Sequence, residues 1–162
     1  KRMKRRHTKQ QAIKFCEKVR NFRSDVVFGA DIIAGFPTET DEMFEDSIDL
    51  IKKCNLTHLH VFPFSARKST PAINMPQVPK NIIKKRAKIL RELGNTNLRK
   101  YLKNQTGSKV RVLIEQAKDT ISIGKSQHFT KIEIPQVLKE GSIVNCIITD
   151  VHENISKATL IS

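Results

Sequence analysis

Two short stretches at the ends of apolar runs carry the residues best placed to bind a small ligand. Gly35-Phe36-Pro37-Thr38-Glu39-Thr40 follows one run, and Phe62-Pro63-Phe64-Ser65-Ala66-Arg67 includes the end of the next. Gly35 lets the backbone come close to a ligand, and the helix start that follows presents N–H groups without intrahelical partners. Alone, these residues are compatible with two interpretations: a nucleotide-like ligand, or a tight turn without any ligand.

Cysteines and histidines offer a weaker case for a metal. Cys16, Cys54 and Cys146 are far apart and odd in number, a pattern typical of reduced thiols in a cytoplasm that are buried as small apolar groups. His58 and His60 alternate along one expected strand and therefore face the same side. A metal pair is conceivable, but no third ligand is evident, and ordinary residues of a sheet wall are the simpler interpretation.

The positive charge is concentrated in two blocks. The chain has a net charge of +14; residues 1–25 carry 10 Lys or Arg against 2 acidic residues, and residues 79–105 carry 9 against 1. A polyanion is the natural partner of such blocks, because neutralised phosphates release their counterions. The alternative is a basic protein whose helix faces are simply solvated.

The residues before position 80 are predicted to alternate between helix and strand. Thr8 begins a capping box, and the helix after it would place Phe15, Cys16 and Phe22 on one apolar face. The apolar run 26–34 predicts a strand buried on both faces of a parallel sheet. Thr40 caps a second helix, and residues 57–62 form a second strand, which completes a βαβ unit. The stretches 35–40 and 62–67 then meet at the carboxyl edge of the sheet.

The remaining sequence predicts a long helix and a small barrel. After a loop with four prolines, a helix is expected from about Asn81 to Asn104, apolar on one face and basic on the other. From Thr106 the pattern alternates in five short runs, which indicates a small closed barrel. We therefore expect an α/β region over residues 1–105 and an all-β barrel over residues 106–162.

Three stretches match a known family in order and spacing. They are Met3-Lys4-Arg5-Arg6-His7-Thr8, then Asp31-Ile32-Ile33-Ala34-Gly35-Phe36-Pro37-Thr38-Glu39-Thr40, then Phe64-Ser65-x-Arg67-x-x-Thr70-Pro71-Ala72. Together they resemble the second half of the radical S-adenosylmethionine barrel of methylthiotransferases, a partial parallel (β/α) barrel. Residues 106–162 resemble the RNA-binding TRAM barrel of the same enzymes. The first two motifs are similar to the branch that acts on N6-threonylcarbamoyladenosine beside the anticodon of tRNA, because other branches usually have Gly in place of Thr38.

The resemblance implies a reaction, cofactors and partners. The enzyme would convert that nucleoside to its 2-methylthio derivative, using S-adenosylmethionine, 4Fe–4S clusters and an electron donor. The tRNA anticodon stem-loop would be its substrate. The residues implied for the cofactor are Arg5 at the methionyl carboxylate, Gly35, Phe36 and Pro37 beside the adenosyl group, Asp31 on the same strand, and Ser65 at the adenine edge. For RNA, the basic residues expected to make contact are Lys84, Lys85, Lys88, Arg91 and Arg111.

Several departures from the family pattern limit what this chain can do. The Cys-x-x-x-Cys-x-x-Cys triplet that binds the cluster is absent, so we expect no catalytic residue and no metal ligand here. The chain also begins without Met, and we expect it to be a fragment that is inactive alone. The alternative is a truncated remnant that acts only as an RNA-binding module. Ser69 stands where the family usually has Gly, and Lys157-Ala158 replaces a Gly-containing strand end.

The sequence also bears on location. No apolar run approaches the roughly 18 residues that a membrane span needs, and the opening residues are basic and polar rather than apolar. We therefore expect a cytoplasmic protein without a secretory signal or a membrane contact.

Overall fold

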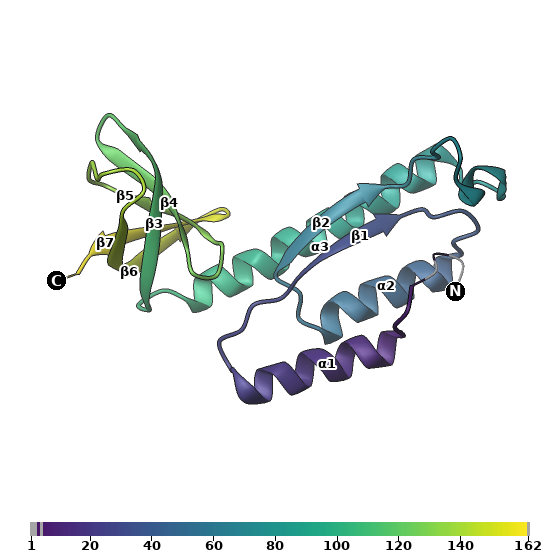
Figure 1. Cartoon of the computed structure of the whole chain (residues 1–162), viewed down its shortest axis with the longest axis horizontal. Coiled ribbons are helices and arrows are strands. Elements are labelled where there is room, and N and C mark those ends of the chain that lie inside the picture. Colours follow the sequence, from purple (N-terminus) through teal and green to yellow (C-terminus); the bar gives the residue numbers. More distant parts are fainter. Residues whose placement is uncertain (1–2, 4, 162) are drawn as a thin grey trace. The chain divides into compact units, whose positions relative to one another are not determined.

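The computed structural model describes residues 3 and 5–161, and the chain in it divides into two compact units. The first unit is Lys1–Asn97 and the second is Leu98–Ser162 (Figure 1). The division falls within the long helix, a few residues before the boundary that the change of sequence period suggests. Among the described residues, no helix is long and apolar enough to cross a membrane.

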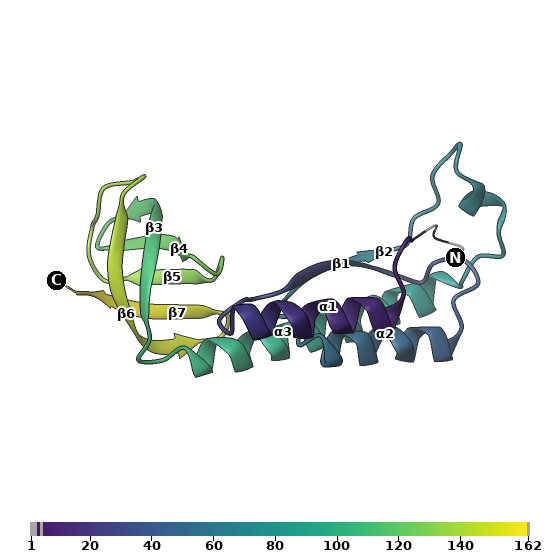
Figure 2. The same ribbon diagram turned by 60° about the horizontal axis from the view of Figure 1, so that its bottom comes forward.

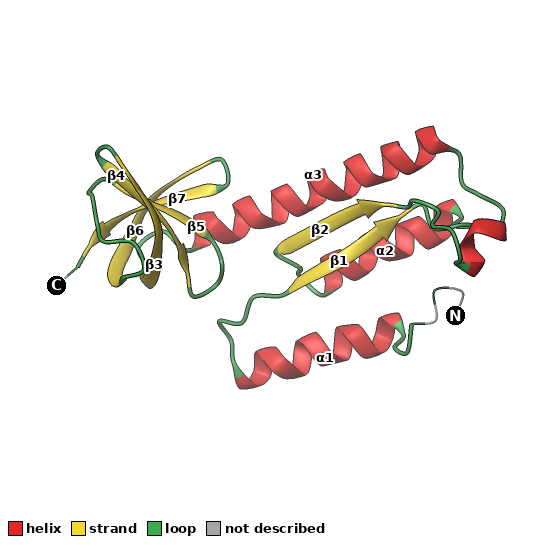
Figure 3. Cartoon of the chain, turned by 45° about the horizontal axis from the view of Figure 1, so that its top comes forward, coloured by secondary structure: helices red, strands yellow, loops and turns green. Residues whose placement is uncertain are grey.

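The first unit is built on a parallel βαβ unit, as expected. Its elements are α1 (Lys9–Phe22), β1 (Gly29–Ala34), α2 (Asp41–Lys53), β2 (His58–Pro63), the 3₁₀ turn η1 (Pro71–Asn74) and most of α3 (Lys80–Asn104). β1 and β2 pair in parallel, with Gly29 opposite His58 and Ala34 opposite Pro63. Figure 3 shows the two strands running in the same direction with α2 between them in sequence.

Local hydrogen bonds fix the starts of the first two predicted helices. Thr8 and Gln11 form the reciprocal capping box of α1, with the Thr8 N–H donating to Gln11 Oε1 at 2.8 Å. The Thr40 hydroxyl accepts from the Met43 N–H at 3.3 Å, and Asp41 and Glu42 occupy the first turn of α2. Carboxylates there are favoured by the helix dipole. Both predicted caps are confirmed.

Contacts between α1 and α2 hold the first helix in place. Lys9 lies 2.7 Å from carboxylate oxygens of both Asp46 and Asp49. At the other end of α1, Arg20 donates to the Cys54 carbonyl at 2.6 Å and stacks over the Phe28 ring. That carbonyl lies at the end of α2, where a cation is favoured by the helix dipole.

Two expectations about burial in this unit are wrong. β1 was expected to be buried on both faces, yet Gly29 and Asp31 are exposed. In the described part of the chain its sheet contains two strands, so β1 lacks the neighbours that an interior strand has. On α1, Cys16 is buried, but Phe15 and Phe22 are 62% and 83% exposed. The buried stripe of α1 instead contains Ile13 and Cys16.

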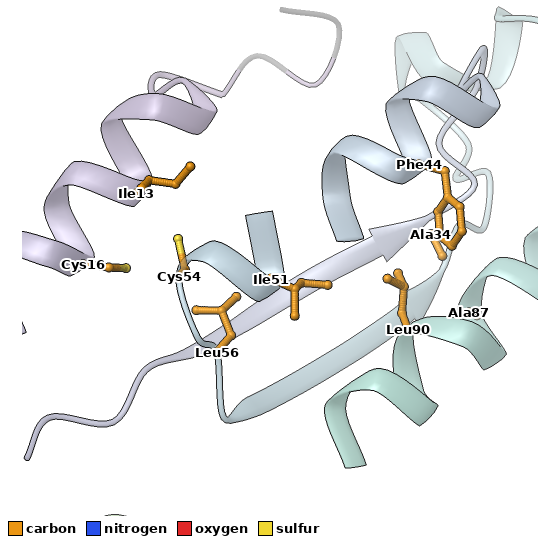
Figure 4. Close-up of a cluster of buried hydrophobic side chains, with 9 residues drawn as sticks. All are labelled: Ile13, Cys16, Ala34, Phe44, Ile51, Cys54, Leu56, Ala87 and Leu90. Atoms are coloured by element: carbon orange, nitrogen blue, oxygen red, sulfur yellow. The ribbon is translucent and has the colours of Figure 1, made fainter. Parts of the chain in front are cut away.

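The core of the first unit lies between the sheet and its helices (Figure 4). Its buried residues are Ile13, Cys16, Ala34, Phe44, Ile51, Cys54, Leu56, Ala87 and Leu90. Burial, with a further contribution from hydrogen bonding to Cys16, raises the pKa of the Cys54 thiol to about 11. All three cysteines of the chain are free and buried, which confirms their role as small apolar groups.

The second unit is a closed barrel of five strands (Figure 2), as the alternation predicted. The strands are β3 (Lys109–Lys118), β4 (Ile121–Ser126), β5 (Lys131–Ile134), β6 (Ile143–His152) and β7 (Ile155–Leu160). They follow the order β3-β4-β5-β7-β6, and only the β5–β7 pair is parallel. Alternate residues point inward, and the core consists of Val110, Val112, Ile114, Ile132, Ile134, Cys146, Ile148 and Ala158.

Candidate functional site

The loops after β1 and β2 meet at the carboxyl edge of the parallel sheet, as expected. The Phe64 N–H donates to the Ala34 carbonyl at 2.8 Å, which joins the two loops directly behind the strands. The rings of Phe36 and Phe64 then pack edge to face, with centroids 5.4 Å apart. This arrangement places an aromatic pair beside the polar residues of both loops.

Gly35 is required by the loop for reasons of backbone and packing. Its φ is +76°, a left-handed conformation that costs glycine little. A Cβ atom at this position would lie 2.5 Å from Cγ1 of Ile83 on α3. The close neighbour of Gly35 is therefore a helix side chain, which explains the glycine without any ligand.

A buried ion pair holds this loop, and the sequence analysis did not identify it. The Gly35 N–H donates to both carboxylate oxygens of Glu39, at 3.1 and 3.3 Å. Arg86 on α3 donates to Glu39 Oε1 at 2.7 Å and to the Glu39 carbonyl at 3.0 Å. The side chains of Arg86 and Glu39 are 6% and 10% exposed. The pair thus fixes the Gly35–Glu39 turn against α3.

Arg86 also contacts two residues of α2. Its Nη2 donates to Asp41 Oδ1 at 2.7 Å, and its guanidinium lies over the Phe44 ring at 5.3 Å. Its position between Ile83 and Leu90, at helical spacing, could have indicated that Arg86 faces inward. In the sequence, Arg86 is one of nine basic residues in the block 79–105, and the charge pattern alone does not distinguish it from the others.

The residues predicted to hold the cofactor occupy different environments. Pro37 is almost fully buried and Phe36 is half-buried. Asp31 is exposed within β1, three residues before the strand ends, and Ser65 is exposed just after β2. Arg5 is exposed in the segment before α1 and takes no part in the loop contacts described above. Lys4 of the same motif lies outside the described residues. The structure therefore brings Gly35, Phe36 and Pro37 together with the loop that contains Ser65.

Two loop positions adopt the left-handed backbone that glycine tolerates best. Thr38 has a φ of +66° and Ser69 a φ of +68°, and these are the positions where the resembling family, or its other branches, usually have Gly. The Thr38 N–H donates to the Pro76 carbonyl at 3.1 Å, which ties the two loops together a second time. The loop geometry thus suits glycine at both positions.

Both histidines of the predicted pair lie on β2. His58 is half-buried and His60 exposed on β2, where His60 lies opposite Asp31 of β1. The described residues contain no group of three or more His, Cys, Asp or Glu side chains that could hold a metal ion.

The predicted RNA-contacting residues are exposed, on two elements. Lys84, Lys85, Lys88 and Arg91 lie on the solvent side of α3, where Arg91 reaches the Val61 carbonyl at 3.3 Å. Lys88 lies 3.8 Å from Glu92, a surface pair of small energetic value. Arg111 is exposed on β3 of the barrel.

Similarity to individual proteins, rather than to a family model, indicates the relatives of this chain. No family model matches the chain. It is 47% identical to the threonylcarbamoyladenosine tRNA methylthiotransferase MtaB of Rickettsia prowazekii over 99% of this chain and 37% of that protein. It is 33% identical to the protein of the same name from Chlamydia pneumoniae, over 85% of this chain and 33% of that protein.

A relative with a different name is similar over a shorter part of the chain. The chain is 35% identical to the tRNA-2-methylthio-N(6)-dimethylallyladenosine synthase of Aquifex aeolicus, over 76% of this chain and 28% of that protein. The chain spans about a third of the length of these curated relatives. On these similarities, the chain is homologous, over most of its own length, to a segment of the tRNA methylthiotransferases.

Proposed function

We propose that this chain is a segment of an enzyme that converts N6-threonylcarbamoyladenosine in tRNA to its 2-methylthio derivative. The observation that carries the proposal is the 47% identity to a relative of that name, maintained over 99% of the chain. We further propose that the enzyme works in the cytoplasm with an electron donor and recognises the anticodon stem-loop.

We assign the first unit to the wall of an S-adenosylmethionine site, as the later part of a radical S-adenosylmethionine barrel. The carboxyl edge of β1 and β2 fits such a ligand, because a half-buried aromatic pair lies beside exposed polar residues there. Phe36 would contact the adenosyl group, Asp31 and Ser65 its polar edges, and Arg5 the methionyl carboxylate. Bound there, the cofactor would supply the methyl group and, on reductive cleavage, an adenosyl radical.

The remaining residues of the edge serve to position that wall. Pro37 is too deeply buried to contact a ligand, and the space beside the Gly35 Cα is filled by the Ile83 side chain. Glu39 and Arg86 hold the turn in place from the opposite side. Their contribution is to keep Phe36 at the edge of the sheet.

An iron–sulfur cluster does not fit the cysteines of this chain. Cys16 and Cys54 are buried in the core of the first unit, and Cys146 is buried inside the barrel. Cluster ligands must converge on one group of irons, so no step of the reaction is assigned to these thiols. The second candidate function, a chain that only binds RNA, rests instead on the exposed cations of α3 and of the barrel.

We propose that the barrel is a TRAM domain and that RNA binding rests mainly on phosphate contacts. Lys84, Lys85, Lys88 and Arg91 of α3 and Arg111 of the barrel are exposed cations able to make them. Affinity for tRNA should then fall with salt, by about 0.7–0.9 in log–log slope for each phosphate neutralised.

A salt titration of tRNA binding tests this proposal. Replacing Lys84, Lys85, Lys88 and Arg91 together by Ala is expected to flatten the slope by about 3–3.5, if each of the four makes one phosphate contact. Replacing Lys52 and Lys53 of α2 by Ala removes exposed cations outside the proposed surface and should leave the slope unchanged. Equal slopes for the parent and the quadruple variant would show that the basic face of α3 is only solvated.

A further inference from the structure

The outer face of the barrel exposes two large aliphatic side chains next to each other. Leu113 of β3 and Ile143 of β6 are directly opposite in their antiparallel ladder and are 43% and 66% exposed. The alternating neighbours Val112 and Ile114 point inward and are at most 1% exposed. The barrel core is therefore complete without Leu113 and Ile143, and their exposure adds nothing to its stability.

Cations surround this aliphatic pair. Lys125 of β4 lies opposite Leu113, and Lys131 of β5 lies opposite Lys125, so basic residues continue the same row around the barrel. Arg111 stands two residues before Leu113 on the same face, opposite Asn145 of β6.

Two carboxylates lie close to the cations. Glu115 is 3.4 Å from Lys125, and Glu133 lies on β5 beyond Lys131, opposite Ile123. Both side chains of the Lys125–Glu115 pair are more than 40% exposed, so the pair is weak and open to competition. With Lys125, Lys131 and Arg111 together, the face retains an excess of positive charge.

The surface around these residues is hollowed. One hollow of about 160 Å³ is lined by Arg111, Leu113, Lys125, Ser126, Gln127 and Ile143. A second, of about 260 Å³, is lined by Lys109, Val110, Arg111, Gln127, Asn145 and Ile161. They share Arg111 and Gln127 and therefore adjoin along β3.

Gln127 and the size of the hollows indicate what could bind. The Arg111 N–H donates to Gln127 Oε1 at 3.0 Å, which holds the Gln127 amide at the junction and leaves its NH₂ as the group for a ligand. Shallow hollows of this size accept flat groups better than a whole helix, whose diameter is about 10–12 Å.

We propose that this surface, the barrel face formed by Arg111, Leu113, Lys125, Ile143 and Asn145, binds unpaired nucleotides of RNA. Bases lie over the aliphatic pair, and the phosphates between them contact Arg111 and Lys125. The inference rests on the proposed RNA binding and specifies which part of the RNA the barrel binds.

The combination of charge and apolar surface selects this ligand. A duplex would present phosphates to Arg111 and Lys125, but its base faces are stacked away and would leave the aliphatic pair uncovered. Unpaired nucleotides offer phosphates and base faces together, and the amides of Asn145 and Gln127 can bond exposed base edges. The excess of positive charge favours a polyanion over a protein partner.

The test compares two RNA probes on the 162-residue chain. One probe is a hairpin with a seven-nucleotide loop, and the other is a blunt duplex with the same number of phosphates. The double variant Leu113→Ala with Ile143→Ala is expected to bind the hairpin about tenfold more weakly, as expected for loss of contact with a base. Its affinity for the duplex should change less than about twofold, because the phosphate contacts remain.

A matched control and the circular dichroism spectrum guard against misfolding. Val137→Ala removes an equally exposed aliphatic side chain between β5 and β6 and should change neither affinity. If the double variant weakens both probes equally, or neither, the inference is overturned while the proposed RNA binding stands. If the parent chain binds neither probe, the proposed RNA binding itself fails, and this inference with it.

Discussion

Replacing Arg86 by Ala is expected to lower the free energy of unfolding of the first unit by about 3–5 kcal/mol. The guanidinium is 6% exposed and lies 2.7 Å from the nearly buried Glu39. Removing it leaves the Glu39 carboxylate charged and desolvated, with the Gly35 N–H as its remaining hydrogen-bond donor in the turn. Breaking one side of a buried pair is costly for this reason, even where the intact pair adds little.

The second carboxylate near Arg86 should contribute much less. Asp41 lies 2.7 Å from Nη2 of Arg86, but its side chain is 97% exposed, so solvent screens the interaction. We therefore expect Asp41→Asn to change the stability by less than about 1 kcal/mol. This contrast separates burial from proximity as the source of the effect.

Urea unfolding followed by circular dichroism measures the effect of Arg86→Ala. Lys85→Ala, at the exposed neighbouring position of α3, should stay within about 0.5 kcal/mol of the parent. The double variant Glu39→Gln with Arg86→Met should recover much of the loss, because no buried charge remains. A change below 1 kcal/mol for Arg86→Ala would contradict the role assigned to the pair.

Replacing Gly124 by Ala is expected to destabilise the barrel by about 2–3 kcal/mol. A Cβ atom there would lie 2.2 Å from the Leu113 carbonyl oxygen and 2.8 Å from Cγ1 of Val112. The oxygen belongs to the neighbouring strand of the ladder, so it cannot move away as the end of a flexible side chain could. The strands must separate locally, at the place where β3 also contains a register shift.

Thermal unfolding of the barrel, compared with a second glycine substitution, tests this explanation. Gly107→Ala has nothing within 4 Å of its new Cβ and pays only for a φ of +84°. It should therefore cost only about 1–2 kcal/mol. Equal or smaller destabilisation by Gly124→Ala would show that the close approach is not what requires glycine there.

The elements of the fold were predictable because their signals are local. The caps at Thr8 and Thr40 and the change from helical to alternating period at Thr106 depend only on nearby residues, and the structure confirms both caps and the five-stranded barrel. Burial was less predictable, because it depends on neighbours elsewhere in the fold. Phe15 and Phe22 have the spacing of residues on one apolar helix face, yet nothing among the described residues covers that side of α1.

The candidate site shows the same limit. Polar residues after adjacent parallel strands had to meet at one edge, and the contact between Phe64 and Ala34 shows that the loops do. The ion pair of Glu39 and Arg86 joins residues 47 positions apart, and no local pattern specifies it. Gly124 carried a usable signal, since glycine inside a strand often marks a close approach of two backbones.

The proposed function is tested most directly in a chimeric enzyme. The matching third of the relative that is 47% identical is replaced by this chain, and the chimera is expressed in cells that lack their own enzyme. A matched chimera carries Gly35→Val, which should misplace the wall beside the cofactor, since any Cβ there meets Ile83.

Mass spectrometry of digested tRNA then measures the 2-methylthio derivative of N6-threonylcarbamoyladenosine. The account predicts that the chimera restores this nucleoside and that the Gly35→Val chimera does not. A soluble chimera that binds tRNA but leaves N6-threonylcarbamoyladenosine unmodified would contradict it.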